Sequence, residues 1–422
     1  MNARVPVAVW AAVAVGVAVR LVFALGYWID KPLTHDEREY LLLSANVAAG
    51  RGFVYLNPDG SPAPGEHFGR APIYPLFLAG LTRLVGPGPA ARAAQAPPDG
   101  PEDAGAPDPR LLRAVRLAQA CLGGAVVWLV AWLAGRAAGP RAAVAAGALS
   151  AIYPPLVWTP AYVWSETLFS VLALACAAVL TLDHRRILVP AGAGALAGLA
   201  VLTRPAMLLF LPFALAWLAW RRRWRPAAMF ILACVVVVAP WTIRNAREYG
   251  RFVLVASEGG ITFWTGNHEL ASGEGDLAAN PDLKRANVAL RSKHPGMSPE
   301  QLEPIYYRDA MRFIRERPGA WMGLLARKAF YTVVPAGPSY RLHSPRYLWA
   351  SVASYLAVLP FALLGLASLA RRGEMPAPLL LLAASSFAAC LLFFPQERFR
   401  IPVVDPALVV LAASWLALRV TA

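Results

Sequence analysis

Long apolar runs recur along nearly the whole chain, and they constrain its fold more strongly than any other feature. A helix needs about 20 predominantly apolar residues to cross the hydrocarbon core of a bilayer. Runs close to this length lie at 5–28, 111–134, 141–158, 166–182, 205–220, 227–242, 347–370, 376–394 and 400–418, with a shorter Gly/Ala-rich run at 187–202. The sequence therefore predicts an all-α polytopic membrane protein with about ten transmembrane helices, within a range of about 9 to 12.

The composition agrees with this class of protein. Hydrophobic residues make up 58% of the chain and charged residues 15%, whereas an average soluble domain has about half and about a quarter. The formal net charge is +15, but the basic residues form short clusters between apolar runs. That is the pattern of the positive-inside rule, so it predicts membrane topology and argues against a nucleic-acid partner.

The arginine clusters orient the predicted helices. The segment 221–225 anchors a cytoplasmic loop, and so do the arginines at 136 and 141, 185 and 186, and 371 and 372. Alternation from these anchors, with 72–86 and 321–336 left as interfacial or re-entrant helices, places the other loops outside. Those outer loops hold Asp36, Glu37, Glu166, Arg204, Arg244 and the segment 396–400. The chain is expected to lie in the plasma (inner) membrane, with its functional side chains on the extracytoplasmic face.

Polar segments divide the chain into three predicted parts. Residues 1–242 form an N-terminal membrane module, whose outer loop 29–110 includes a flexible Pro/Gly-rich linker at 87–109. Residues 243–320 form an extracytoplasmic region, expected to combine a strand-like run at 252–256 with a helix at 299–316. Residues 321–422 contribute the C-terminal membrane helices.

Motifs typical of nucleotide-binding and metal-dependent enzymes are absent from the sequence. There is no GxxxxGK[ST], no GxGxxG after a soluble strand, no HExxH and no GxSxG. The four cysteines all fall inside apolar runs, and no metal-ligand spacing is present. No cofactor and no metal are expected, so the energy for a reaction must arrive in an activated substrate delivered through the membrane.

Two acidic sites lie at the predicted outer membrane surface. Asp36 and Glu37 directly follow the first apolar run, and Glu166 begins another. Desolvation at such a surface raises a carboxyl pKa toward the range useful for a general base. A carboxylate at this depth is also costly unless it is used or paired. A polar cap on a transmembrane helix is the alternative interpretation of each site.

Three arginines on the same face are candidate phosphate ligands. Arg70 stands in a Pro-rich turn, and a guanidinium forks onto two phosphate oxygens; a snorkelling interfacial Arg is the alternative. Arg398 and Arg400, beside Glu397, would face one anion in an extended turn. The alternative there is an Arg–Glu surface pair, which contributes little to stability.

Aromatic and amide side chains complete the candidates. Trp264 is a candidate to stack on a sugar ring, with core packing as the alternative, and Asn267 is a candidate to hydrogen-bond sugar hydroxyls. Tyr74 fits an aromatic belt better than a binding platform. Gly259 and Gly260 allow close backbone approach.

The order of these motifs resembles the phospholipid-carrier-dependent glycosyltransferases of family 39, the protein mannosyltransferase and lipid A aminoarabinose transferase group with the GT-C membrane fold. The resemblance covers nearly the whole chain. Each motif is weak alone, and the order makes the set specific to the superfamily, though not to one substrate. The matching pieces are Asp36-Glu37 with Tyr40, Arg70 to Pro75, Ser165 to Phe169, Leu202 to Pro205, Pro240 to Asn245, Gly260 to Asn267, and Glu397 to Pro402.

The resemblance implies inverting transfer of a sugar from a polyprenyl-phosphate donor to a hydroxyl acceptor on a lipid, glycan or protein. By that analogy Asp36 is the general base with Glu37 beside it, and Glu166 takes the place of the family's second acidic residue, which is often Asp. Arg70, Arg398 and Arg400 would neutralise the leaving lipid phosphate. The remaining substrate-binding candidates are Tyr74, Arg204, Arg244, Trp264, Asn267 and Glu397.

Two other classes of protein fit parts of the pattern. A transporter or flippase of a lipid-linked sugar would place polar residues near the bilayer midplane on broken helices. A scaffold protein would not need acidic and arginine motifs gathered on one face. The ionisable residues of this chain fall mainly at the outer ends of the predicted spans, which favours the enzyme.

Overall fold

The structure, a computed structural model, is almost entirely helical. It describes residues 6–56, 62–67, 70–86, 108–182, 187–275, 277–334, 337 and 344–419. The predicted linker 87–109 lies outside the described residues except for its last two positions, and so do the arginines at 185 and 186. The predicted all-α membrane class is confirmed.

Four helices among the described residues are long and apolar enough to cross a membrane. They are α1 with its π-helical end (Val7–Tyr27), α4 (Pro109–Ala138), α10 (Trp224–Tyr249) and α15 (Pro345–Arg372). A bent pair, α5 (Pro140–Ile152) with α6 and its following turn (Pro154–Ala161), makes a fifth candidate, with a bend of 64°. Pro154 follows the break and cannot continue the helix of the preceding run, because it lacks a backbone N–H.

Several other predicted spans fold as shorter apolar helices of 10–17 residues. These are α3 (Ile73–Val85), α7 (Glu166–Leu180), α8 (Leu188–Val201), α9 (Phe210–Trp220) with the turn Pro205–Leu209, and α16 (Ala377–Leu392). The last helix, α18 (Val404–Arg419), is largely buried in the bundle. The count of about ten spans therefore stays a prediction, since helix length alone supports four or five.

Small residues let the membrane helices approach closely. A Cβ added to Gly194 of α8 would lie 2.0 Å from the Phe230 carbonyl oxygen of α10, and one on Gly365 of α15 would lie 1.9 Å from the Leu411 oxygen of α18. Helix pairs in bilayers associate through such small-residue contacts, because lipid provides no hydrophobic drive between them. Glycine is thus required at both positions for the bundle to pack.

Two buried arginines donate to backbone carbonyl groups of the bent pair, Arg20 at the bend itself and Arg116 at the end of the second arm. Arg20 of α1 donates to the carbonyl oxygens of Ser150 and Ala151, each at 3.1 Å. Arg116 of α4 donates to Ala161 at 3.2 Å. A carbonyl without a partner is costly inside a bilayer, so these arginines have a structural explanation.

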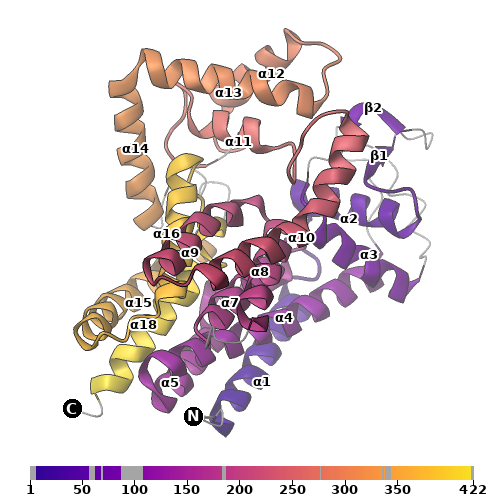
Figure 1. The fold of residues 1–422 in the computed structure, drawn as a ribbon. Coiled ribbons are helices and arrows are strands. Elements are labelled where there is room, and N and C mark those ends of the chain that lie inside the picture. The colour runs from indigo at the N-terminus through magenta and orange to yellow at the C-terminus, as the bar shows by residue number, and fades with distance from the viewer. Residues whose placement is uncertain are drawn as a thin grey trace.

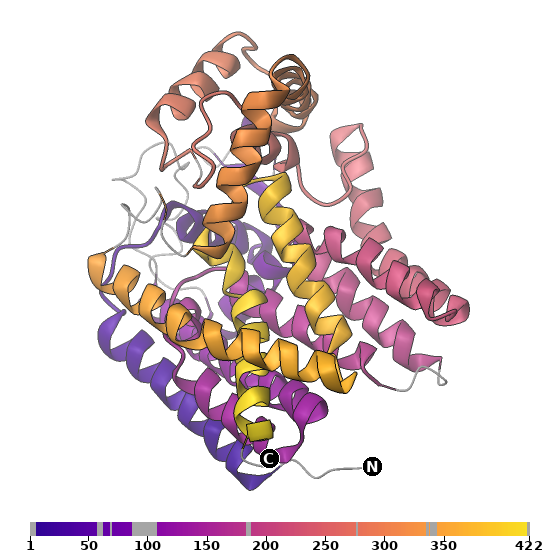
Figure 2. The same ribbon diagram turned by 90° about the vertical axis from the view of Figure 1, so that its left-hand side faces the viewer.

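A separate layer of helices covers one end of the bundle, opposite the chain termini (Figures 1 and 2). It consists of α11 (Gly259–Gly266), α12 (Pro281–Ser292), α13 (Pro299–Glu316) and α14 (Pro318–Val333). The predicted helix 299–316 is confirmed and begins with a capping box between Ser298 and Gln301. This layer places the segment just before α11 against the ends of the membrane helices.

The strand predicted at 252–256 is wrong. The carbonyl oxygens of Val253 and Val255 accept hydrogen bonds from Asn245, and Val255 also accepts one from Trp241. Both donors belong to α10, so side chains replace the neighbouring strand that a sheet would require. The two short strands that do form are β1 (Val54–Leu56) and β2 (Pro62–His67), which pair antiparallel.

Candidate active site

The first turn of α2 (His35–Ala48) presents two adjacent carboxylates with different environments. Thr34 caps the helix, and its side chain accepts from the Glu37 N–H. The Glu37 carboxylate turns back and accepts from the Thr34 N–H at 2.7 Å and from the Val163 N–H at 2.8 Å. Glu37 is 1% exposed, so it serves as a buried cap.

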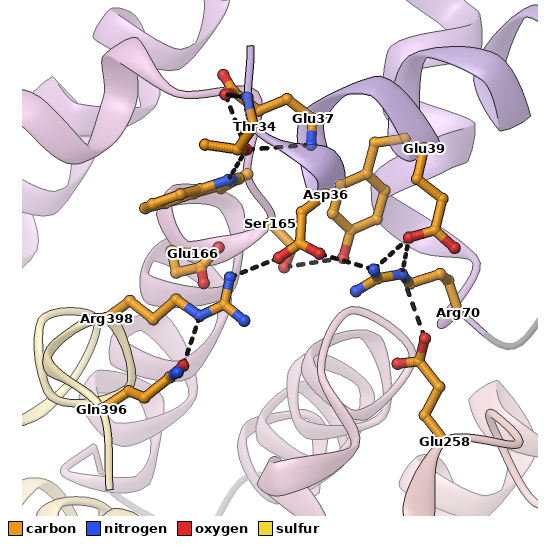
Figure 3. A network of polar contacts seen from close by, with 12 residues as sticks. Thr34, Asp36, Glu37, Glu39, Arg70, Ser165, Glu166, Glu258, Gln396 and Arg398 are labelled. Atoms are coloured by element: carbon orange, nitrogen blue, oxygen red, sulfur yellow. Dashed lines mark hydrogen bonds and ion pairs between the residues drawn. The ribbon is translucent and has the colours of Figure 1, made fainter. Parts of the chain in front are cut away.

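Asp36 points the other way and lies between two arginines (Figure 3). Its Oδ1 is 2.9 Å from Arg70 Nη2, and its Oδ2 is 2.5 Å from Arg398 Nη1. Arg70 stands just before α3, whereas Arg398 belongs to the short helix α17 (Glu397–Arg400). The exposed fractions are 21% for Asp36, 17% for Arg70 and 28% for Arg398, so all three reach solvent.

Arg70 gathers two further carboxylates that the sequence analysis did not single out. It pairs with Glu39, one turn after Asp36 on α2, and its Nε lies 3.4 Å from Glu258 Oε1. Glu258 is the residue before α11, so the outer layer contributes a group to this cluster. Its side chain is 44% exposed. Carboxylates favour helix N-termini, where the helix dipole is positive, and both Asp36 and Glu258 occupy such positions.

A second ion pair lies beside the first. Glu166, at the start of α7, is 2% exposed and its Oε1 lies 2.6 Å from Arg204 Nη1. Arg204 also donates to the Ser165 hydroxyl at 3.2 Å, and that hydroxyl accepts from Tyr40 at 3.4 Å. The Tyr40 ring in turn stacks under the Arg70 guanidinium, 5.2 Å from ring centroid to Cζ. The two ion pairs thus form one network.

The ring of Phe399 links the two ion pairs, because one arginine of each pair packs over it. Arg204 and Arg398 both pack over this ring, with Cζ atoms 5.3 Å and 5.4 Å from its centroid. Arg398 also packs over the Trp164 ring at 5.7 Å. Cation–π contacts of this kind restrict a guanidinium to one plane. The arginines are therefore held in place before any ligand is bound.

The surroundings shift the acidic groups in opposite directions. Burial raises the pKa of Asp36, but the charges of Arg398 and Arg70 outweigh it and hold the pKa well below its ordinary value. Burial raises the pKa of Glu37, although its hydrogen bonds from Thr34 and Val163 oppose the shift. Desolvation raises the pKa of Glu258, Arg70 lowers it, and Glu39 and Asp36 add to the rise.

Two of the sequence-predicted residues lie next to the network without joining its ion pairs. Tyr74 is fully buried, donates to Gln119 Oε1 at 3.1 Å and meets the edge of the Tyr40 ring. Arg244 lies on α10 and contacts Asn245 and the Tyr249 hydroxyl. Within the described part of the chain, neither makes a hydrogen bond or ion pair with Asp36, so the ion-pair cluster forms without them.

Trp264 and Asn267 lie inside the outer layer. The Trp264 ring is 1% exposed, and its indole N–H donates to Asp309 at 2.8 Å. Asn267 accepts from Trp321 and from Lys328 Nζ, each at 3.1 Å, and donates to Leu392. The core-packing interpretation of Trp264 therefore describes the structure, and the Asn267 amide is already occupied by protein groups.

Glu397 and Arg400 face away from Arg398 despite their closeness in sequence. Arg400 Nε lies 2.8 Å from Asp405 Oδ1, and both side chains are nearly inaccessible to solvent. Glu397 accepts from Ser351, and burial raises its pKa to about 7. The predicted pair of anion-facing arginines is thus divided, because α17 is a helical turn and not an extended one.

Solved structures with this arrangement of helices exist. The archaeal oligosaccharyltransferase AglB from Archaeoglobus fulgidus, in complex with an inhibitory peptide and a dolichol-phosphate, matches with a TM-score of 0.55 and 16% identity over 98% of this chain and 50% of that chain. Its apo form matches with a TM-score of 0.57, 15% identity and the same coverage. The chain has the GT-C membrane fold. It spans about half the length of the AglB chains it matches.

A weaker likeness, with a TM-score of 0.45 and 15% identity over 98% of this chain and 78% of that chain, is to ArnT from Cupriavidus metallidurans bound to undecaprenyl phosphate. No protein-family model and no curated protein sequence matches the chain.

Within this GT-C fold, the residues missed by sequence reasoning share one property. Glu39 and Glu258 each stand one or two positions from a residue that was singled out, and only the fold brings them into contact with Arg70 (Figure 3). A signal existed for Glu39, which follows Asp36 by three residues and so shares its helix face. Among the described residues, no group of three or more His, Cys, Asp or Glu side chains has an arrangement that would hold a metal ion.

Proposed function

We propose that the chain is an inverting glycosyltransferase that moves a sugar from a polyprenyl-phosphate donor to a hydroxyl acceptor at the outer membrane surface. The observation that carries this proposal is the placement of Asp36 between Arg70 and Arg398. One anionic base and two phosphate-binding cations meet at a partly exposed point where three segments of the chain converge. The GT-C fold, shared with an oligosaccharyltransferase in complex with an inhibitory peptide and a dolichol-phosphate, supports the same class of donor.

The proposed reaction is a single displacement. Asp36 accepts the proton of the acceptor hydroxyl as its oxygen attacks the anomeric carbon of the sugar. The bond from that carbon to the phosphate oxygen breaks, and the electron pair leaves with the polyprenyl phosphate. Arg70 and Arg398 stabilise the negative charge that develops there, since preorganised donors in a partly dry site act strongly on such charge. Inversion follows because attack and departure occur on opposite faces.

Donor binding raises the pKa of Asp36 and so makes it a stronger base than it is in the free protein. In the free site the two arginines keep Asp36 ionised and therefore a weak base. A phosphate that recruits Arg398 and Arg70 offsets their charge, so the pKa of Asp36 rises toward the range where general bases are efficient. Asp36 therefore becomes an efficient base only when the donor is bound. Without the donor, it does not remove the proton of the acceptor hydroxyl.

The adjacent acidic residues take different roles in this scheme. Glu37 is buried and caps α2, so it positions Asp36 without touching the substrate. Glu166 fixes Arg204, whose guanidinium packs with Arg398 over the Phe399 ring. Glu258 adds a carboxylate beside Arg70 from the segment just before α11.

The proposed location is the plasma membrane, with the site on the extracytoplasmic face. The site lies beside the start of α11, whereas Arg136, Arg221 and Arg223 line a cavity at the C-terminal ends of α4 and α9. The positive-inside rule supports a cytoplasmic position for these arginines. A transporter is the weaker candidate, because its polar residues would gather near the bilayer midplane. The charged residue well inside α1, Arg20, is occupied by backbone carbonyls.

Mass spectrometry of glycolipids, glycoproteins and envelope glycans tests the proposal directly. Membranes containing the unaltered protein should hold a glycosylated product that is missing when Asp36→Asn replaces it. Asp282→Asn is the matched control, because Asp282 is an exposed residue of α12 that pairs only with Arg285 in the described contacts. Identical products from the Asp36→Asn protein and the unaltered protein would exclude Asp36 as the base, and the same products in membranes that lack the protein would exclude the transferase assignment.

A further inference from the structure

A cavity of about 500 Å³ lies far from the proposed active site. Its walls are the C-terminal ends of α4, α7 and α9 together with the turn that connects α15 to α16. Ligand pockets commonly have volumes of about 300 to 1,000 Å³. The cavity is therefore large enough to hold a phosphate group with several attached carbon atoms.

Helix α4 runs from the Asp36 site to the cavity, so its geometry gives their separation. The start of α4 packs on Tyr40 through Leu112 and Val115, whereas Leu133, Arg136 and its last residues line the cavity. On this helix Val115 and Leu133 stand 18 positions apart and Leu112 and Arg136 stand 24 apart, so at about 1.5 Å per residue the two ends are separated by about 27 to 36 Å. The hydrocarbon core of a bilayer is about 30 Å thick. The separation along α4 is close to this thickness, which fits sites at opposite membrane surfaces.

Positive charge dominates the cavity. Arg136, Arg221 and Arg223 line it, and Glu374 is the acidic side chain among its lining residues. Arg136 packs over the Trp132 ring at 6.0 Å, and Arg221 packs over the Trp217 ring at 5.4 Å. Within the part of the chain that the structure describes, no ion pair joins Arg136 or Arg221 to a carboxylate. These guanidinium groups keep their charge available to an anion.

The remaining walls are apolar and continuous with the membrane helices. Leu133, Leu180, Trp217 and Pro378 line the cavity beneath the arginines. A free inorganic anion would make no favourable contact with such an apolar surface, whereas the glycerol and first acyl carbons of a lipid would. The positive-inside rule accounts for arginines at this surface, but it does not require a half-apolar cavity between them.

We propose that this cavity binds the head group of an anionic phospholipid from the leaflet opposite the Asp36 site. Arg136 and Arg221 bind the phosphate, Arg223 adds positive charge at the rim, and Leu133 and Leu180 contact the glycerol end of the acyl chains. Basic pockets between transmembrane helices on the cytoplasmic side are suited to such lipids, because that leaflet carries the anionic head groups. The bound lipid fixes the loop ends of α4, α9 and α16 at one membrane surface.

Native mass spectrometry of the delipidated full chain tests this site with defined probes. Phosphatidylglycerol should bind more tightly than phosphatidylcholine, which has the same phosphate but no net charge. Arg136→Gln and Arg221→Gln should each weaken phosphatidylglycerol binding about fivefold, while Arg136→Lys should retain most of it. The melting temperature of each variant, measured in the same detergent, shows whether it is folded.

Arg222→Gln and Arg225→Gln are the matched controls. Both arginines lie in the same basic turn and are exposed, but neither lines the cavity. Their phosphatidylglycerol affinity should stay unchanged. An equal loss in the controls, equal binding of the two lipids, or displacement of phosphatidylglycerol by inorganic phosphate at matched concentration would each overturn the proposal. None of these variants alters the proposed transferase site, so loss of the lipid site and loss of transfer are separate results.

Discussion

Arg398 Nη1 lies 2.5 Å from Asp36 Oδ2, although 362 positions separate the two residues in the chain. The contact joins the first helix after α1 to the turn before α18. Because Arg70 holds the other carboxylate oxygen at 2.9 Å, the orientation of Asp36 is fixed from two directions. The site therefore exists only when the N-terminal and C-terminal parts of the bundle are assembled together.

Replacement of Asp36 by Asn should remove activity without unfolding the protein. A positioned general base contributes roughly 10²- to 10⁴-fold to a rate, so the turnover number should fall by about that factor. Stability should change by at most about 1 kcal/mol, because the broken ion pairs are partly exposed. Steady-state kinetics and thermal unfolding measure the two effects. Near-normal turnover would remove Asp36 from the role of base.

Replacement of Glu37 by Gln should have the opposite profile. Its carboxylate accepts hydrogen bonds from the Thr34 and Val163 N–H groups in a buried position. The amide of Gln would place a donor against one of these donors, which should lower the free energy of unfolding by about 1–3 kcal/mol. Denaturant or thermal unfolding checks this. A fully stable variant with greatly reduced turnover would instead assign Glu37 a direct part in catalysis.

Replacement of Arg398 by Gln should move the acid limb of the pH–rate profile. Burial raises the pKa of Asp36, and Arg398 and Arg70 together hold it below the ordinary value. Because the base must be ionised, activity is lost as pH falls through that pKa. Removal of one cation raises the pKa, so the Arg398→Gln protein should lose activity at a higher pH than the unaltered protein. An acid limb at the same pH in both proteins would contradict the coupling.

The Glu166–Arg204 pair should show strong non-additivity. Glu166 is 2% exposed and lies 2.6 Å from Arg204. Arg204→Met leaves this carboxylate buried and unpaired, which should cost about 3–5 kcal/mol, whereas the double variant Glu166→Gln, Arg204→Met should recover most of that loss. Thermal or denaturant unfolding of the four proteins completes the cycle. Additive losses would show that the pair is not coupled.

Lys328 should make the stability of the outer layer depend on pH. Burial lowers its pKa to about 7, against an ordinary value of 10.5. The unfolded chain therefore binds one more proton than the folded chain between about pH 7 and 10.5, so stability should rise with pH across this window. Lys328→Met should flatten that dependence. The melting temperature measured from pH 6 to about 10 distinguishes the two proteins; parallel curves would show that Lys328 does not titrate here.

Local sequence patterns were enough to place most elements that form the site. The helix start at Ser298, the start of α3 after Arg70 and the apolar run after Glu166 are determined by neighbouring residues. Patterns failed where side chains replaced a neighbouring strand, as at Val253 and Val255, and where a short helical turn separated Arg398 from Arg400. Local propensity carries no information about such distant partners.

The sequence alone determined that the chain is helical, that it belongs in a membrane and which acidic and arginine motifs were worth testing, because apolar length and charge asymmetry are local properties. Only the tertiary structure distinguished the role of Asp36 from that of Glu37, since burial and hydrogen bonding depend on which residues the fold brings near each carboxylate. The same holds for Glu258, which is an ordinary loop residue in sequence and lies 3.4 Å from Arg70 in the fold.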